Sequence, residues 1–265
     1  MQADFLRTYD HYLYALVALL GTVLGVAAIQ WFLRRSRWAR WAASLRGVAP
    51  PFINIIGVLF GLTLAFLAND TWSAHDRATN AVFREADALR SLATLSGALP
   101  GPLQGRVRAA IAGYGQASAA EWPLLARRQS SAQVPAQADA LLGLLASREI
   151  ASAAGDTVQA LMLRQVSDIR AERDQRIGLS QTHVNPLKWL GMAFLGLVTL
   201  LSLALVHVEN PRAALAAMVL FSLAAAPTAA IVLVQGNPFE APAAVSPAPI
   251  AAAVRGLPGA LPAVD

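Results

Sequence analysis

The sequence contains no cysteine, and only 14% of its 265 residues are Asp, Glu, Lys or Arg. The lack of cysteine excludes disulfides, thiolate nucleophiles and cysteine-ligated metals. The four histidines include no pair at the spacing that places two metal ligands on one helix face. His75 with Asp76 is typical of a solvated face rather than of half a metal site. No catalytic or nucleotide-binding motif is recognisable either, so we expect no enzyme activity, no metal and no cofactor.

The scarcity of charge accompanies a hydrophobic content of 56% and a mean hydropathy of +0.48, which is typical of a membrane protein. The net charge is +5, and Lys188 is the one lysine among the basic residues. The positive excess lies beside apolar segments, where membrane orientation explains it. No groove-reading or stacking motif is present, so no nucleic-acid partner is expected.

Four apolar segments are long enough to cross a bilayer. They span about residues 13–32, 52–68, 187–208 and 213–234. The first is followed by an arginine-rich stretch that is typical of a stop-transfer signal, so we interpret it as an uncleaved anchor. Tryptophan lies at several segment ends, as aromatic residues do at membrane interfaces. Pro227 interrupts the fourth segment, and we interpret it as a residue that adjusts how this helix packs against its neighbours.

The pattern predicts an all-α fold in which an antiparallel helical extramembrane domain is inserted between the second and third of four transmembrane helices. The predicted organisation is an N-terminal transmembrane hairpin (1–70), the helical domain (71–186), a C-terminal transmembrane hairpin (187–234) and a Pro- and Ala-rich tail (235–265). No Gly or Pro marks a turn after the second segment, so that helix, like the third, is expected to continue into the domain.

Within the helical domain, apolar periodicity predicts four helices. The first carries the stripe Trp72, Thr79, Phe83, Ala86, Leu89, Leu92 and Leu95. The second fits 103–125 with a bend near Pro123, the third fits 136–146, and the fourth begins near Asp156. Residues expected to be buried in the second helix are Val107, Ile111, Tyr114 and Trp122. A short helix is also expected near Pro249 to Leu257.

The second apolar segment carries one face of small and polar residues. We define the α-helical stripe as Asn54, Val58, Gly61, Ala65 and Asn69, which recur three or four residues apart. One interpretation is a pore lining with an apolar constriction between the two asparagines. The other is close helix packing, because Gly57 and Gly61 form a GxxxG pair. The pattern alone favours packing, and both interpretations stay open.

A second spacing pattern involves Arg170, Arg173 and Arg176, with acidic residues between them. It indicates either an anion-attracting stripe or a solvated helix face with intrahelical ion pairs, of which the solvated face is the simpler interpretation. Glu85 and Asp87 on the first long helix are candidate partners for these arginines.

Several segments together resemble the bacterial bestrophin-like membrane family of unknown function. They are LAFLANDTWSAHDRATNAVFREADALRSL (64–92), EWPLL (121–125), RAERDQRIGLS (170–180) and NPFEAPAAVSPAPI (237–250). The matching family positions are Trp72, Asp76, Arg77, Glu85, Trp122, Arg173, Arg176, Pro238 and Phe239. The resemblance implies four membrane helices with a helical insert. It also implies that the 237–250 segment packs against the helical domain near the membrane surface.

A more distant similarity links this family to bestrophins, which are pentameric anion channels whose second membrane helix lines the pore. Asn69, Asp76 and Arg77 occupy comparable places, whereas only Phe60 and Phe66 are available for the aromatic neck. The similarity implies self-association within the lipid bilayer and small anions as the transported partner. The function expected on this basis is a homo-oligomeric anion channel. The alternative is a non-conducting scaffold or sensor whose helical domain binds a partner or ligand.

The orientation expected from charge differs from that of bestrophins. The loop between the first two segments contains Arg34, Arg35, Arg37, Arg40 and Arg46 and no acid, which predicts a cytoplasmic loop. The N-terminus, the helical domain and the tail would then be extracytoplasmic, in a multi-pass protein of the bacterial inner membrane. The bestrophin similarity implies a cytosolic insert instead, and our expectation follows the charges.

Overall fold

The computed structural model describes residues 10–35, 49–181 and 186–258, and all secondary structure in these ranges is helical. The described residues belong to two compact units. Unit 1 takes its residues from Met1–Trp72 and His183–Gly236, and unit 2 from Ser73–Thr182 and Asn237–Asp265. Each unit is described by itself.

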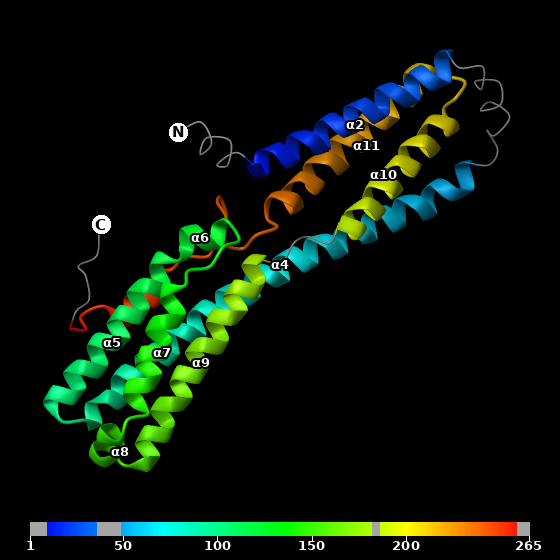
Figure 1. The fold of residues 1–265 in the computed structure, drawn as a ribbon. Coiled ribbons are helices and arrows are strands. Elements are labelled where there is room, and N and C mark those ends of the chain that lie inside the picture. The colour runs from blue at the N-terminus through cyan, green and yellow to red at the C-terminus, as the bar shows by residue number, and fades with distance from the viewer. Residues whose placement is uncertain (1–9, 36–48, 182–185, 259–265) are drawn as a thin grey trace, which may run out of the picture. The chain divides into compact units, whose positions relative to one another are not determined.

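Unit 1 contains apolar helices. They are α2 (Asp10–Arg35), the first part of α4 (Ala49–Leu95), α10 (Pro186–Val206) and α11 (Pro211–Val234). Helix α11 packs against α2 on one side and α10 on the other (Figure 1). Among the described residues, α4, α10 and α11 are long and apolar enough to cross a membrane. Helix α2 covers the first expected span, and its segment Leu19–Phe32 is apolar.

The packing of unit 1 rests on two apolar clusters. One joins Phe60 and Leu67 of α4 to Met192 of α10 and Val232 of α11. The other joins Val26 and Ile29 to Leu200, Ala204 and Met218. Buried hydroxyls in these helices donate to the carbonyl four residues earlier, as they do at Thr199 and Ser202. Such bonds satisfy polar groups that have no water available in a bilayer.

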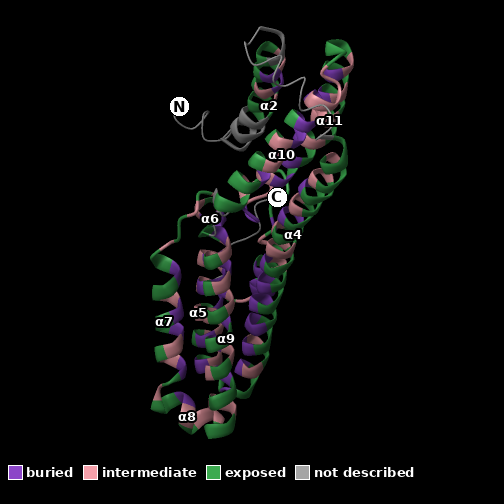
Figure 2. Ribbon diagram, turned by 90° about the vertical axis from the view of Figure 1, so that its right-hand side faces the viewer, coloured by how far each residue is buried: buried purple, intermediate pink, exposed green. Residues whose placement is uncertain are grey.

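Unit 2 is a helical bundle. Besides the later part of α4 and the 3-10 turn η1 (Ser96–Ala98), it contains α5 (Gly101–Ala120), α6 (Trp122–Ala126), α7 (Gln133–Leu145), α8 (Arg148–Ala154), α9 (Asp156–Gln181) and α12 (Ala248–Val254). Its helices turn their buried sides toward one another (Figure 2). The core contains Val107, Ile111 and Tyr114, each 0% exposed, with Trp122 8% exposed, so the predicted burial of these four is confirmed.

The expected helix boundaries need several corrections. The helix predicted over 103–125 divides at Glu121 into α5 and α6, with Pro123 in the first turn of α6, where proline is tolerated. Helix α8 was not predicted. Helix α4 is continuous from Ala49 to Leu95, as expected for the second segment. Continuity at the third segment cannot be followed, because residues 182–185 lie outside the described ranges, as does the arginine-rich loop 36–48.

The apolar stripe predicted for α4 was wrong at two positions. Trp72 and Phe83 are 60% and 52% exposed. The buried face of α4 in unit 2 instead follows Ala78, Val82 and Glu85 and continues through Leu89. The predicted face was placed toward Trp72 and Phe83 because large aromatic residues dominate an apolar periodicity pattern, in which alanine is a weaker signal.

The tail folds onto unit 2. Trp122 donates from Nε1 to the carbonyl of Val245 at 2.6 Å, and Phe239 meets the Trp122 ring edge-on with centroids 5.7 Å apart. Helix α12 packs against α5, where a Cβ on Gly115 would collide with the side chain of Val254. The segment therefore packs against the helical domain, as its resemblance to the family implied.

Candidate functional site

The membrane part of α4 presents three different faces. The first is buried against α10 and α11 and includes Phe60, Leu67 and Ala68, which are 4–8% exposed. The second carries large apolar side chains that the other described helices leave uncovered. Its members Ile55, Leu62 and Phe66 are 57%, 50% and 68% exposed. These two faces are those of a helix packed against its own bundle on one side and bordered by an apolar medium on another.

The third face is the stripe predicted from the sequence. All five of its members, Asn54, Val58, Gly61, Ala65 and Asn69, are exposed. A Cβ placed on Gly57 or Gly61 would meet no atom within 4 Å. The described helices of the chain therefore neither cover this face nor pack closely against Gly61 or the nearby Gly57. Whatever covers the stripe comes from outside the described residues.

An ion pair lies directly beyond the stripe. The carboxylate of Asp70 accepts from Nζ of Lys188 on α10 at 2.6 Å, with both side chains 56% exposed. A pair this exposed contributes about 0–1 kcal/mol to stability. The pair does, however, lie beside Asn69, and Lys188 neutralises the negative charge of Asp70. The end of the stripe is therefore polar but carries no net charge from this pair.

Unit 2 contains a buried polar cluster centred on Arg176 of α9. The Arg176 guanidinium donates from Nε to Oε2 of Glu85 at 2.7 Å and from Nη2 to Oγ of Ser118 at 2.7 Å. Glu85 also accepts from the hydroxyls of Tyr114 and Ser118 at 2.9 and 2.7 Å. The guanidinium carbon lies 4.7 Å from the ring centroid of Trp122, within cation–π range. The cluster thus joins α4, α5, α6 and α9.

A second buried pair lies next to the first. Arg173 donates in a fork to both carboxylate oxygens of Glu121, at 2.6 and 3.2 Å, and also to the carbonyl of Ser131. The backbone N–H of Ser131 donates to Glu121 at 2.8 Å. Bidentate pairs of this kind are geometrically specific. The two arginines are balanced by two glutamates, so the cluster holds no excess positive charge.

These contacts overturn the interpretation of the arginine spacing. Arg173 and Arg176 are 7% and 0% exposed, so they form neither a solvated face nor an anion-attracting stripe, and their pairs cross between helices. Arg170 pairs with Asp139 of α7. The expected partnership of Glu85 is confirmed for Arg176 alone, whereas Asp87 pairs with Arg90 on its own helix.

Tyr114 shows the electrostatic character of the cluster. Burial removes water from its phenol, and the neighbouring Glu85 carboxylate disfavours a second negative charge. Both effects raise the pKa of Tyr114 well above its usual value near 10. The phenol therefore stays protonated and remains a hydrogen-bond donor to Glu85 throughout the neutral range.

The positions carried by the family resemblance divide into two groups. Those buried in unit 2 are Glu85, Trp122, Arg173, Arg176, Pro238 and Phe239. Trp72, Asp76 and Arg77 are exposed and take no part in the cluster. Sequence reasoning missed Ser118 and Glu121 as members. The signal was present, because Tyr114, Ser118 and Glu121 are spaced by four and three and so share one helix face.

The fold and the apolar helices together define a class, that of all-helical membrane proteins. Three crystal structures of a bacterial Bestrophin homolog from Klebsiella pneumoniae are similar over almost the whole chain. Two point mutants give TM-scores of 0.65 and 0.64 at 15% and 14% identity, covering 94% and 92% of this chain and 95% and 96% of theirs. A structure solved by Zn-SAD phasing gives 0.60 at 15% identity, covering 92% of this chain and 95% of that one.

The Bestrophin-like domain profile matches residues 20–250. The chain therefore belongs to the Bestrophin-like family, as the resemblance of its segments indicated. No curated protein matches the sequence. At 14–15% identity the crystal structures establish the shared fold.

Proposed function

We propose that this protein assembles with copies of itself in the membrane and conducts small anions along the stripe of α4. The observation that carries this proposal is the exposure of all five stripe residues while the opposite face of α4 is packed. The membership of the chain in the Bestrophin-like family adds to it, since bestrophins are anion channels whose second membrane helix lines the pore.

The chemistry of the stripe supports a water-filled path. Exposed asparagine amides in a bilayer are costly unless they meet water or another polar group. Asn54 and Asn69 lie about 22 Å apart along the helix at its 1.5 Å rise per residue. Between them, Val58, Gly61 and Ala65 are apolar and small. Around a symmetry axis, such a face forms polar mouths flanking an apolar constriction.

The topology of the proposal has four membrane spans, with α2 as the first. The inner membrane of a bacterium is the proposed location, and the arginine-rich loop between α2 and α4 is proposed to face the cytoplasm. The N-terminus, unit 2 and the tail then face outward.

An anion-flux assay in proteoliposomes tests the conduction proposal. Wild-type oligomer is expected to pass anions, and both Val58→Arg and Ala65→Trp are expected to lower the flux strongly, because they charge or narrow the constriction. Leu223→Trp is the matched control, since Leu223 is 67% exposed on α11 and lies on another helix. Absence of flux from oligomeric wild type, or equal loss in the control, would contradict the proposal.

A second candidate is a non-conducting scaffold or sensor. The space around Gly57 and Gly61 favours it, because helices of neighbouring copies approach closely at such glycines. In that case the stripe is buried between copies and no water path forms. An assembly of stable stoichiometry that passes no anions would favour this candidate, whereas flux that responds to Ala65→Trp would exclude it.

A further inference from the structure

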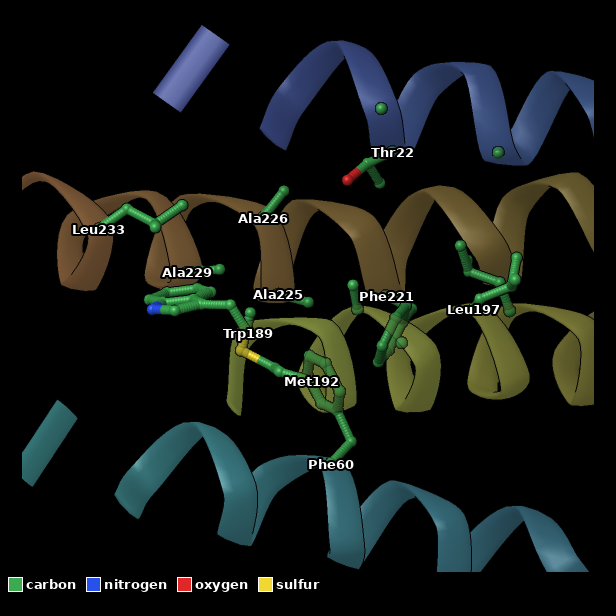
Figure 3. Close-up of a pocket in the computed structure, with 15 residues that line it drawn as sticks. Thr22, Phe60, Trp189, Met192, Leu197, Phe221, Ala225, Ala226, Ala229 and Leu233 are labelled. Atoms are coloured by element: carbon green, nitrogen blue, oxygen red, sulfur yellow. The ribbon is translucent and has the colours of Figure 1, made fainter. Parts of the chain in front are cut away.

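Unit 1 contains a cavity that its apolar packing leaves open. It has a volume of about 500 Å³ and lies among α2, α10 and α11, with Phe60 of α4 on its wall (Figure 3). This is within the range of about 300–1,000 Å³ that is typical of small-molecule sites. The cavity exists because small residues face it. A Cβ on Gly21 or Gly25 would meet no atom within 4 Å.

The lining of the cavity is apolar, apart from Thr22 and the indole of Trp189. An ordered water needs two to four polar partners, which this apolar lining does not supply, so water is a poor occupant. Of the helices around it, α10 and α11 have the length and composition of membrane spans, and α2 carries the shorter apolar segment Leu19–Phe32. The medium that surrounds them is therefore hydrocarbon, and the chemistry of the cavity matches an acyl chain.

The indole N–H of Trp189 indicates which kind of apolar ligand fits the cavity, because it requires a hydrogen-bond acceptor. Its Nε1 atom is buried and has no hydrogen-bond partner among the described residues. A buried indole N–H normally has an acceptor. Trp189 lies three residues after the start of α10 at Pro186, a position where tryptophan meets the interface of the bilayer. The acceptors available at that depth are the ester carbonyls of phospholipids.

The length of the cavity agrees with this assignment. Figure 3 places Trp189 and Leu233 at one end and Leu197 toward the other, and Leu200 also lines the cavity. From Trp189 to Leu200 the distance along α10 is about 16 Å at a rise of 1.5 Å per residue. That is close to one leaflet of a hydrocarbon core about 30 Å thick.

We propose that one acyl chain of a membrane phospholipid occupies this cavity and that its ester carbonyl accepts a hydrogen bond from Nε1 of Trp189. The lipid fills space between α2 and the α10–α11 hairpin, so it acts as a structural part of unit 1. The assignment does not depend on whether the protein conducts ions.

Photolabelling of the full-length protein tests the proposal. The probe is a phosphatidylglycerol with a diazirine in the middle of one acyl chain, reconstituted in vesicles with the protein, and mass spectrometry locates the labelled residues. Label is expected on residues that line the cavity, such as Ala193 and Ala226. Label confined to outward-facing residues such as Phe194, which is 63% exposed, would show annular lipid only and overturn the assignment.

Cavity-filling variants make the test specific. Gly25→Phe and Ala226→Leu are expected to reduce labelling inside the cavity to background. Gly191→Phe, whose Cβ also meets no atom within 4 Å but which does not line the cavity, is expected to leave it unchanged. Gel filtration shows whether each of these two cavity-filling variants is folded, and one that misfolds can be left out because the other tests the same point. Unchanged cavity labelling in a folded filler overturns the proposal.

The Trp189 contact has its own test. Trp189→Phe keeps an aromatic ring and removes the donor, so cavity labelling is expected to fall about two- to tenfold, the range of one neutral hydrogen bond. Trp31→Phe, on an exposed part of α2, is the control. Equal cavity labelling by a diazirine-bearing free fatty acid would overturn the phospholipid assignment. A cross-link between a second copy of the chain and a residue that lines the cavity would also overturn it, because a subunit contact would then occupy the cavity.

Discussion

Replacing Arg176 by methionine tests the account of the unit 2 core most severely. Arg176 is fully buried and, among the described residues, supplies the one opposite charge that lies at hydrogen-bond distance from Glu85. Methionine keeps much of the packing volume beside Trp122 but leaves the Glu85 carboxylate buried with two hydroxyl donors. Leaving one partner of such a pair uncompensated costs about 3–5 kcal/mol. This is a large share of the stability of about 5–15 kcal/mol that is usual for a folded domain.

The assay is denaturant-induced unfolding of the detergent-solubilised protein, followed by far-UV circular dichroism. Arg90→Met provides the matched control, because the pair of Arg90 with Asp87 is 48% and 70% exposed, and its loss is expected to cost at most about 1 kcal/mol. The double variant Glu85→Leu with Arg176→Met removes both charges. It should lose less than the two single variants together, by about 2–3 kcal/mol. The account of the pair fails if Arg176→Met unfolds like Arg90→Met, or if the two single losses simply add.

Three further outcomes are expected. Burial and Glu85 raise the pKa of Tyr114 in the folded protein, so above pH about 10 unfolding releases the phenol proton. In denaturant titrations above that pH, the stability of the wild type should therefore fall more steeply than that of Tyr114→Phe, by about 1.4 kcal/mol per pH unit. Gly115→Ala should cost about 1–3 kcal/mol, because the new methyl meets Val254, and Val254→Ala should restore most of this loss in thermal melts. A reporter fused after Asp265 should be active outside the cytoplasm, and a cytoplasmic signal would reverse the proposed orientation.

Local patterns predicted the helices and the small, polar stripe, because both depend on residue spacing within one helix. The position of Arg176 could not be predicted in this way. A spacing of three among arginines with acidic residues between them fits a solvated face equally well, and the candidate partners Glu85 and Asp87 could not be ranked from spacing alone. The actual partners of Arg176, Glu85 and Ser118, are 91 and 58 residues away in sequence. Tertiary contacts of this range decide which charged residues are buried.

Two other misses have local causes. Phe83 was placed on the buried face because of its size, whereas Ala78 and Ala81 form that face together with the correctly predicted Ala86. Helix α8 is short, but its boundaries carry recognisable signals. Ser147 caps its N-terminus by accepting from the backbone of Ile150, and Gly155 ends it with a φ of 78°. The capping residues were therefore more informative than apolar periodicity for a helix of this length.

The central claim is that the α4 stripe borders water, and the absence of cysteine allows a direct measurement. Ala65→Cys and Leu62→Cys each introduce the only thiol of the chain, one on the stripe and one on the large apolar face of α4. A thiol reacts with a charged methanethiosulfonate reagent only where water lets it ionise. The account predicts that the anionic reagent lowers anion flux through reconstituted Ala65→Cys and leaves Leu62→Cys unmodified. Flux through Ala65→Cys that is insensitive to the reagent, or equal modification of Leu62→Cys, would contradict it.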